Sequence, residues 1–94
     1  MKVVVGTDAE LVEAADLTSL SVERRGEADV DAVLRAAGAG SAADEHAWLS
    51  IAWLRARGPA GDAEWPAGFA KMIHYAASKG WADAEHKTVR AHIV

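Results

Sequence analysis

The sequence predicts a small α+β domain of two layers, in which about three β-strands are covered by three to four helices. Three observations lead to this prediction. Runs typical of strands occur near both ends of the chain and at residues 19–25, and residues 27–80 are dominated by helical periodicity. The 94 residues contain no repeat and no linker, so we expect residues 1–94 to form a single globular domain.

The N-terminal segments change period twice. The β-branched run KVVVG, residues 2–6, predicts a strand. Thr7 and Glu10 then match a capping box, which predicts a short helix that ends near Leu17. Apolar and polar residues alternate in SLSVERR, and this pattern predicts a half-exposed strand over residues 19–25.

Residues 27–38 return to helical spacing. One stripe of a helix is formed by Val30, Val33, Leu34 and Ala37. Asp29 is the expected N-cap of this helix, and Gly38 is the expected stop after its last turn.

Residues 42–59 predict a further helix, whose apolar side chains spread nearly all round the helical wheel. A helix of this kind is covered on two sides, either by the rest of the chain or by a second copy of it. Trp48 and Trp53 would then point more than about 100° apart. We therefore expect one of them in the core and the other at a pocket or a subunit interface.

Residues 64–81 contain the last predicted helix, which runs to about Lys79 and has a tryptophan near each end. Pro66 suits its first turn, Gly80 its end, and the packing stripe consists of Phe69, Met72, Ile73 and Ala76. Trp65 is expected to staple the start of the helix, and Trp81 to fold back onto its last turn. The alternative is that this segment is an aromatic box that holds a ligand.

The C-terminal segment alternates again. Val89, Ala91 and Ile93 are separated by polar residues, which predicts a terminal strand. The composition of residues 83–92 also permits a helix, which is the alternative. We expect the first and last strands to be neighbours in the sheet.

Composition excludes several classes of protein. The chain has no cysteine, a net charge of −4 and no long apolar run, so we expect a cytoplasmic protein with no membrane and no nucleic-acid partner. Residues 27–57 have the order of a helix-turn-helix unit, but acidic and tryptophan side chains in its second helix disfavour DNA binding. The four histidines match no metal motif, and no phosphate loop or nucleophile motif occurs, so we expect no metal and no cofactor.

Two functions remain. The first is a non-catalytic binding module that uses a Trp-rich helical surface, self-associates as a homo-oligomer, and binds a protein partner or a small apolar ligand. Its candidate ligand or interface residues are Trp48, Trp53, Trp65 and Trp81. The alternative is a small cofactor-independent enzyme with an acid–base pair in a pocket between sheet and helices. Its candidate catalytic pairs are His92 with Arg90 and His74 with Tyr75.

Overall fold

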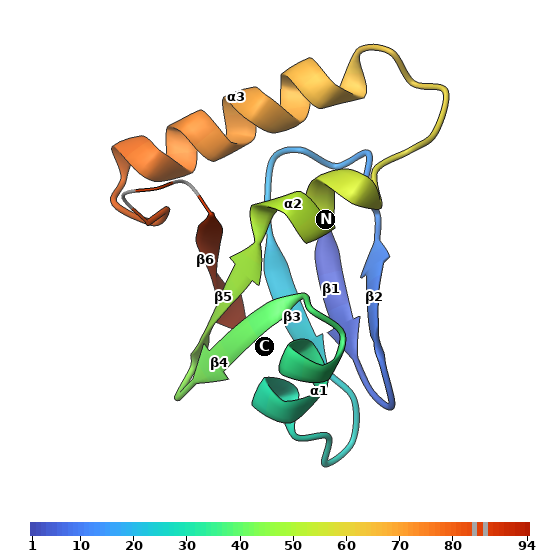
Figure 1. The fold of residues 1–94 in the computed structure, drawn as a ribbon, viewed down its shortest axis with the longest axis vertical. Coiled ribbons are helices and arrows are strands. Elements are labelled where there is room, and N and C mark those ends of the chain that lie inside the picture. Colours follow the sequence, from blue (N-terminus) through green and yellow to red (C-terminus); the bar gives the residue numbers. More distant parts are fainter. Residues whose placement is uncertain (84, 86) are drawn as a thin grey trace.

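The computed structural model describes residues 1–83, 85 and 87–94, which form a six-stranded mixed sheet and three helices (Figure 1). The strands are β1 (Lys2–Val5), β2 (Ala9–Val12), β3 (Ser21–Arg24), β4 (Gly40–Ala43), β5 (His46–Ser50) and β6 (Thr88–Ile93). The helices are α1 (Val30–Ala36), α2 (Ile51–Ala56) and α3 (Trp65–Ser78).

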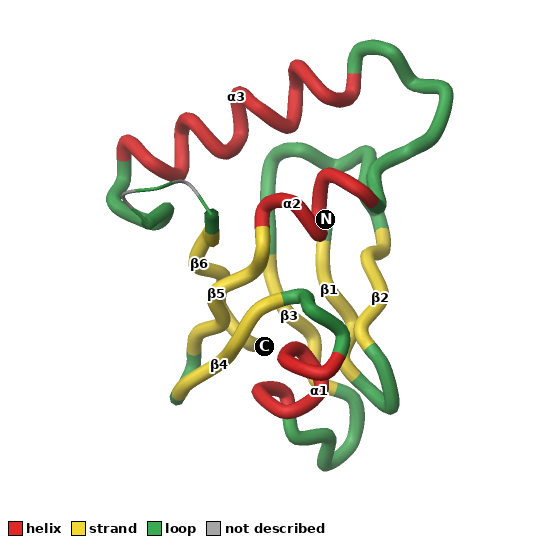
Figure 2. The backbone as a smooth tube through the Cα atoms, viewed as in Figure 1, coloured by secondary structure: helices red, strands yellow, loops and turns green. Residues whose placement is uncertain are grey.

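The strand order is β2-β1-β3-β6-β5-β4. β1, β3 and β6 run parallel to one another in the middle of the sheet. The antiparallel hairpins β1–β2 and β4–β5 form its two ends. The sheet curls, so that β4 begins in front of β3, and α1 lies in the opening of the curl (Figures 1 and 2). α3 crosses the end of the sheet at which β5 runs into α2.

The core fills the inside of the curl. The register aligns Val3 with Val22, Ala47 with Ala91, and Leu49 with Val89, so that their side chains share the inner face. All of these residues are buried in one cluster with Leu34 of α1 and Phe69 of α3. Alternate positions along the same strands therefore point out of the curl.

The predicted two-layer domain of three strands is wrong, because two segments expected to be helical form hairpins instead. The first is residues 7–12, where Thr7 caps no helix. The amide of Gly6 donates to the carbonyl oxygen of Asp8 over 3.0 Å, and β2 turns back to pair with β1. The T-x-x-E pattern satisfies a capping box locally, but pairing with the buried strand β1 satisfies more backbone groups than a short helix would.

The second segment is residues 42–50, which the helical wheel assigned to one long helix. Asp44 has φ of +56° and turns the chain between β4 and β5. Only Ile51–Ala56 is helical, and Ser50 is its N-cap, since its hydroxyl accepts from the amide of Trp53 over 3.1 Å. The expected helix with apolar residues on nearly all sides therefore does not exist.

Several other elements are confirmed. Asp29 caps α1 by accepting from the amide of Ala32 over 3.1 Å, and β1, β3 and β6 lie where strands were predicted. α3 has proline in its first turn, and the amide of Trp81 donates to the carbonyl oxygen of Ala76 over 2.9 Å at its end. The helical alternative for residues 83–92 is wrong for Thr88–Ile93, while residues 84 and 86 lie outside the described residues.

The first and last strands are not neighbours, because β3 lies between them. Both still belong to the parallel middle of the sheet. Among the described residues, no helix combines the length and the apolar composition that crossing a bilayer requires.

Candidate functional site

The outer face of β5 and β6 carries the most distinctive group of exposed side chains. Amide–carbonyl bonds from Ile93 to Glu45 over 2.8 Å and from Ile51 to Lys87 over 2.9 Å fix the hydrogen-bonded positions of this antiparallel pair. The pairs between them, His46–His92 and Trp48–Arg90, are therefore of the non-hydrogen-bonded kind. Side chains approach most closely in such pairs, and both pairs point away from the core.

The two imidazoles meet across the strands. The ring centroids of His46 and His92 are 5.3 Å apart, and the ring planes are inclined at 80°. Arg90 lies two residues before His92 and shares its face of β6. Three nitrogen-bearing side chains are thus gathered on adjacent positions of two strands.

Trp81 is held on the other side of β6. Its carbonyl oxygen accepts from the amide of Arg90 over 2.6 Å, and the amide of Asp83 donates to the carbonyl oxygen of Thr88 over 3.1 Å. Residues 81–83 thus extend the sheet beside β6, ahead of the point where β3 takes over. Tyr75 packs against Trp81 edge to face, with ring centroids 6.2 Å apart.

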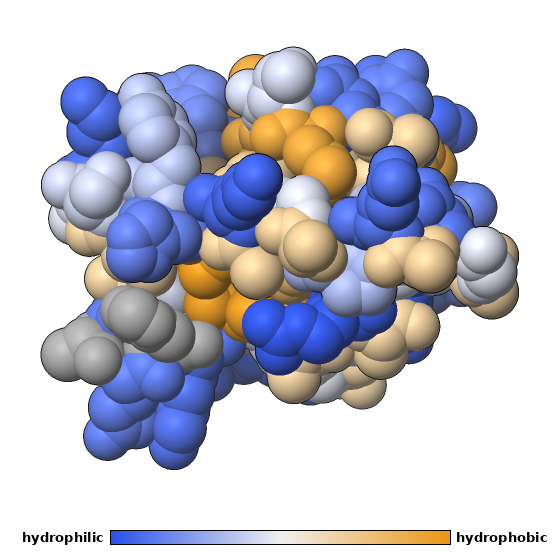
Figure 3. Space-filling view, turned by 90° about the horizontal axis from the view of Figure 1, so that it is seen from above, coloured by the Kyte–Doolittle hydropathy of each residue, from blue (hydrophilic) through white to orange (hydrophobic). Residues whose placement is uncertain are grey.

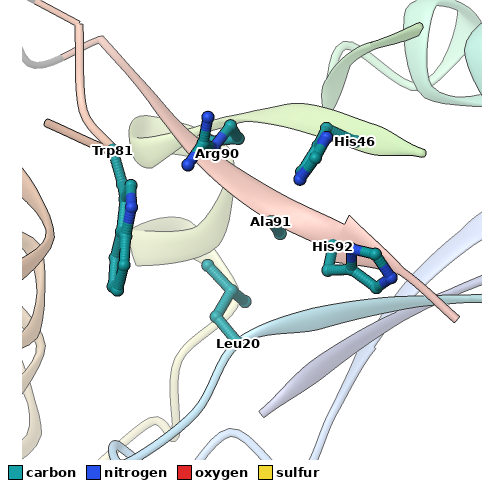
Figure 4. Close-up of a pocket in the computed structure, with 6 residues that line it drawn as sticks. All are labelled: Leu20, His46, Trp81, Arg90, Ala91 and His92. Atoms are coloured by element: carbon teal, nitrogen blue, oxygen red, sulfur yellow. The ribbon is translucent and has the colours of Figure 1, made fainter. Parts of the chain in front are cut away.

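Two adjoining hollows result. The first has a volume of about 280 Å³ and is lined by Leu20, His46, Trp81, Arg90, Ala91 and His92 (Figure 4). In this view Trp81 and Leu20 lie on one side of β6 and His46 on the other, and Arg90 and His92 project from β6 itself. The second hollow, of about 180 Å³, shares Trp81 and Arg90 and adds Trp48. We call the aromatic and basic side chains that line the two hollows, together with Tyr75 that packs on Trp81, the aromatic–basic face. They are His46, Trp48, Tyr75, Trp81, Arg90 and His92.

Carboxylates near this face are already engaged. The carboxylate of Asp83 accepts from the amides of Lys87 and Thr88 over 2.6 and 3.3 Å, and Glu23 lies 3.8 Å from the ammonium of Lys2. Within the described part of the chain, the guanidinium of Arg90 has no carboxylate within 4.0 Å. Among the residues that the structure describes, no acidic side chain lines the first hollow. Asp83 lines the second hollow beside Arg90. In the described part of this acidic protein, the first hollow therefore gathers basic side chains with no acidic side chain in its lining.

The four tryptophans predicted to be ligand or interface residues divide into two groups. Trp48 and Trp81 are 37% and 39% exposed and belong to the aromatic–basic face. Trp53 and Trp65 are buried in the core. The Nε1–H of Trp65 donates to the carbonyl oxygen of Ala14 over 2.7 Å. The ring of Trp65 stacks on Phe69 with centroids 4.8 Å apart, as a staple at the start of α3 would.

The two predicted catalytic pairs differ in whether their members line the same hollow. Arg90 and His92 line the same hollow. His74 and Tyr75 are both exposed on α3, but His74 lines a different hollow beside Arg55, and Tyr75 packs on Trp81.

Sequence reasoning missed His46, which was assigned to a helix and treated as a solvated histidine. Its signal was the alternation His46–Ala47–Trp48–Leu49–Ser50, which matches the alternation of β6.

The other surfaces offer less. Seen from the α3 end, hydrophobic side chains appear as small patches separated by hydrophilic ones (Figure 3). The described residues contain no group of three or more His, Asp or Glu side chains placed to hold a metal ion, and His86 lies outside them. The chain matches no family model, no curated protein and no solved structure with which it was compared.

Proposed function

We propose that the protein is a non-catalytic binding module that recognises another protein through its aromatic–basic face. The observation that carries this proposal is the position of Trp48 and Trp81. Both rings are exposed, and both line one hollow with Arg90. Tryptophan, tyrosine and arginine are the residues that most often contribute large binding energies at protein interfaces.

The strands support binding because they hold the backbone of these residues in place. The β5–β6 ladder fixes the backbone of Trp48 and Arg90, and the bond to the amide of Arg90 fixes the backbone of Trp81. Backbone that is ordered before binding loses less conformational entropy when a partner arrives. Aromatic residues on this sheet therefore gain more net affinity than the same residues on a mobile loop would.

The proposal differs from the sequence-based expectation in its surface. A sheet face replaces the helical surface, and the apolar helix that motivated self-association is absent. Self-association stays a prediction, and sedimentation equilibrium of the purified protein tests it. A homodimer through the aromatic–basic face would dissociate when Trp48 and Trp81 are both replaced by alanine.

Photo-crosslinking tests the proposal. A benzophenone amino acid replaces Tyr75, which is 58% exposed at the edge of the face, and in a matched control it replaces Ala36 on α1. In cells of the source organism we expect a discrete protein adduct from position 75 and not from position 36. Alanine at both Trp48 and Trp81 should abolish that adduct while the protein stays folded at the temperature of the assay, as circular dichroism checks. Identical adducts from both positions, or none from position 75, would refute the proposal.

One observation favours the enzymatic alternative, since Arg90 and His92 share a hollow. His92 is exposed, however, and proton transfer in enzymes gains from the exclusion of water. Binding is therefore the better-supported function. A screen of the purified protein against carboxylate and phosphate esters tests the alternative, which requires a turnover that His92→Gln abolishes.

A further inference from the structure

We propose that the first hollow of the aromatic–basic face binds a carboxylate carried on a flat apolar group. The inference rests on the proposed function and names the chemistry that the face recognises. Its basis is the juxtaposition of Arg90, His46 and His92 with the ring of Trp81 and the side chain of Leu20 in one hollow.

The basic side of the hollow selects the charge of the ligand. In the described part of the chain, Arg90 and the two histidines line it with no acidic side chain, and the nearby carboxylate of Asp83 is occupied by two backbone amides. A guanidinium presents two parallel N–H donors whose spacing matches the two oxygens of a carboxylate. The imidazoles add further N–H donors from the adjacent positions on β5 and β6.

The apolar side selects the body of the ligand. Trp81 and Leu20 form a wall across β6 from His46, and this wall offers an indole face for stacking (Figure 4). The volume of about 280 Å³ lies at the lower end of the range for ligand pockets. A single aromatic ring with a short carboxylate arm fits these limits better than a large ligand does.

A divalent cation is the other ligand that a pair of imidazoles suggests. Arg90 stands on the same face two residues from His92, and its fixed positive charge repels a metal ion. Among the described residues, no carboxylate lines this hollow to complete a coordination shell. The surroundings of the histidine pair therefore favour an anion.

NMR titration with phenylacetate tests the inference, at constant ionic strength and with phenylacetamide as a neutral ligand of the same shape. We expect saturable binding of phenylacetate with a Kd of about 1 mM and binding of the amide about tenfold weaker. The shifts should centre on the His46 and His92 rings and the Trp81 indole. Equal binding of acid and amide, or shifts centred elsewhere, overturns the inference.

Matched arginine variants identify the charged partner. Arg90→Gln should weaken phenylacetate binding about tenfold, and Arg90→Lys should weaken it less because one donor pair remains. Arg57→Gln is the control, since that guanidinium lies 4.1 Å from the ring of Trp53 on α2. Melting curves confirm that each variant is folded. An unchanged affinity in Arg90→Gln overturns the inference.

Two sources of this chemistry are distinguished by a second titration. A hexapeptide that ends in a phenylalanine carboxylate represents a partner protein, and its C-terminal amide is the control. Binding of the peptide acid indicates a protein C-terminus, whereas binding of phenylacetate alone indicates a small molecule, and both results support the inference. A crosslinked partner without binding of either acid leaves the proposed function standing and overturns this inference. Binding of an acid without any crosslinked partner supports this inference and overturns the proposed function.

Discussion

Replacing each buried tryptophan by phenylalanine should have unequal effects on stability. Trp53 and Trp65 are 7% and 4% exposed, so both substitutions remove the same atoms from similarly buried positions. The indole N–H groups differ. That of Trp65 donates to the carbonyl oxygen of Ala14 over 2.7 Å, and that of Trp53 is buried with no hydrogen-bond partner among the described residues.

The difference in free energy follows from these environments. Trp65→Phe loses a hydrogen bond of about 1 kcal/mol and leaves the Ala14 carbonyl without its partner. Trp53→Phe removes an unpaired N–H, which recovers about 1–3 kcal/mol of desolvation cost. It also weakens the contact with the Arg57 guanidinium, 4.1 Å from the ring, by about 0.5 kcal/mol. Trp65→Phe should therefore be the more destabilising variant by about 2 kcal/mol.

Thermal unfolding followed by far-ultraviolet circular dichroism measures this difference. For a domain of this size, about 2 kcal/mol separates two melting temperatures by about 8–16 °C. Trp48→Phe is the control, because an exposed ring at that position contributes little to stability. Equal melting temperatures for the Trp53 and Trp65 variants, or a lower one for Trp53→Phe, would refute the reasoning.

Three further predictions concern Gly40 at the start of β4, the contact of Asp31 on α1 with β4, and the exposed tryptophans. Gly40→Ala should destabilise by about 1–3 kcal/mol, and by more than Gly38→Ala, in urea unfolding. At Gly40 φ is +141° and a Cβ would collide with the backbone oxygen of Trp48, whereas a Cβ at Gly38 meets nothing within 4 Å. The amide of Ala42 and the side chain of Arg35 lower the pKa of Asp31 from its ordinary value of 3.8. Because the pKa of Asp31 is lower in the folded state, its carboxylate contributes stability above pH 3.8, and this contribution is lost as the pH falls through the folded-state pKa. The wild type should therefore have a higher melting temperature than Asp31→Asn at neutral pH, and the two melting temperatures should converge in acid. Acrylamide should quench mainly Trp48 and Trp81, and an unchanged quenching constant after both become phenylalanine would contradict their exposure.

The elements that sequence predicted correctly are those whose local signals agree with their tertiary surroundings. α1 has a capping aspartate and an apolar stripe, and α3 has proline at its start and Gly80, with φ of +77°, after its end. In β6, apolar and polar side chains alternate, and the observed burial alternates with them from buried to exposed. In these cases the residues that form the element also form its packing.

The elements that sequence missed depend on partners distant in the chain. Residues 46–50 alternate as a strand, but the flanking alanines and Glu45 favour a helix on propensity alone. Pairing with β6, whose residues lie 38 to 46 positions later in the chain than their partners, decides between the two patterns. The same pairing assembles the candidate site, so Arg90 and His92 were predicted to share a face while His46 was not. A single error in one segment thus removed two strands and one site residue together.

The pairing of β5 with β6 links stability and recognition in this protein. Ala47, Leu49, Val89 and Ala91 pack the core from its inner face, and the residues between them form most of the aromatic–basic face. Because side chains alternate between the two faces, a shift of β5 by one residue in this register would bury His46 and Trp48 and expose Leu49. The free energy of burying the inner residues therefore also fixes which side chains face outward. Substitutions on the outer face should accordingly change binding at nearly constant stability, and substitutions on the inner face should abolish both.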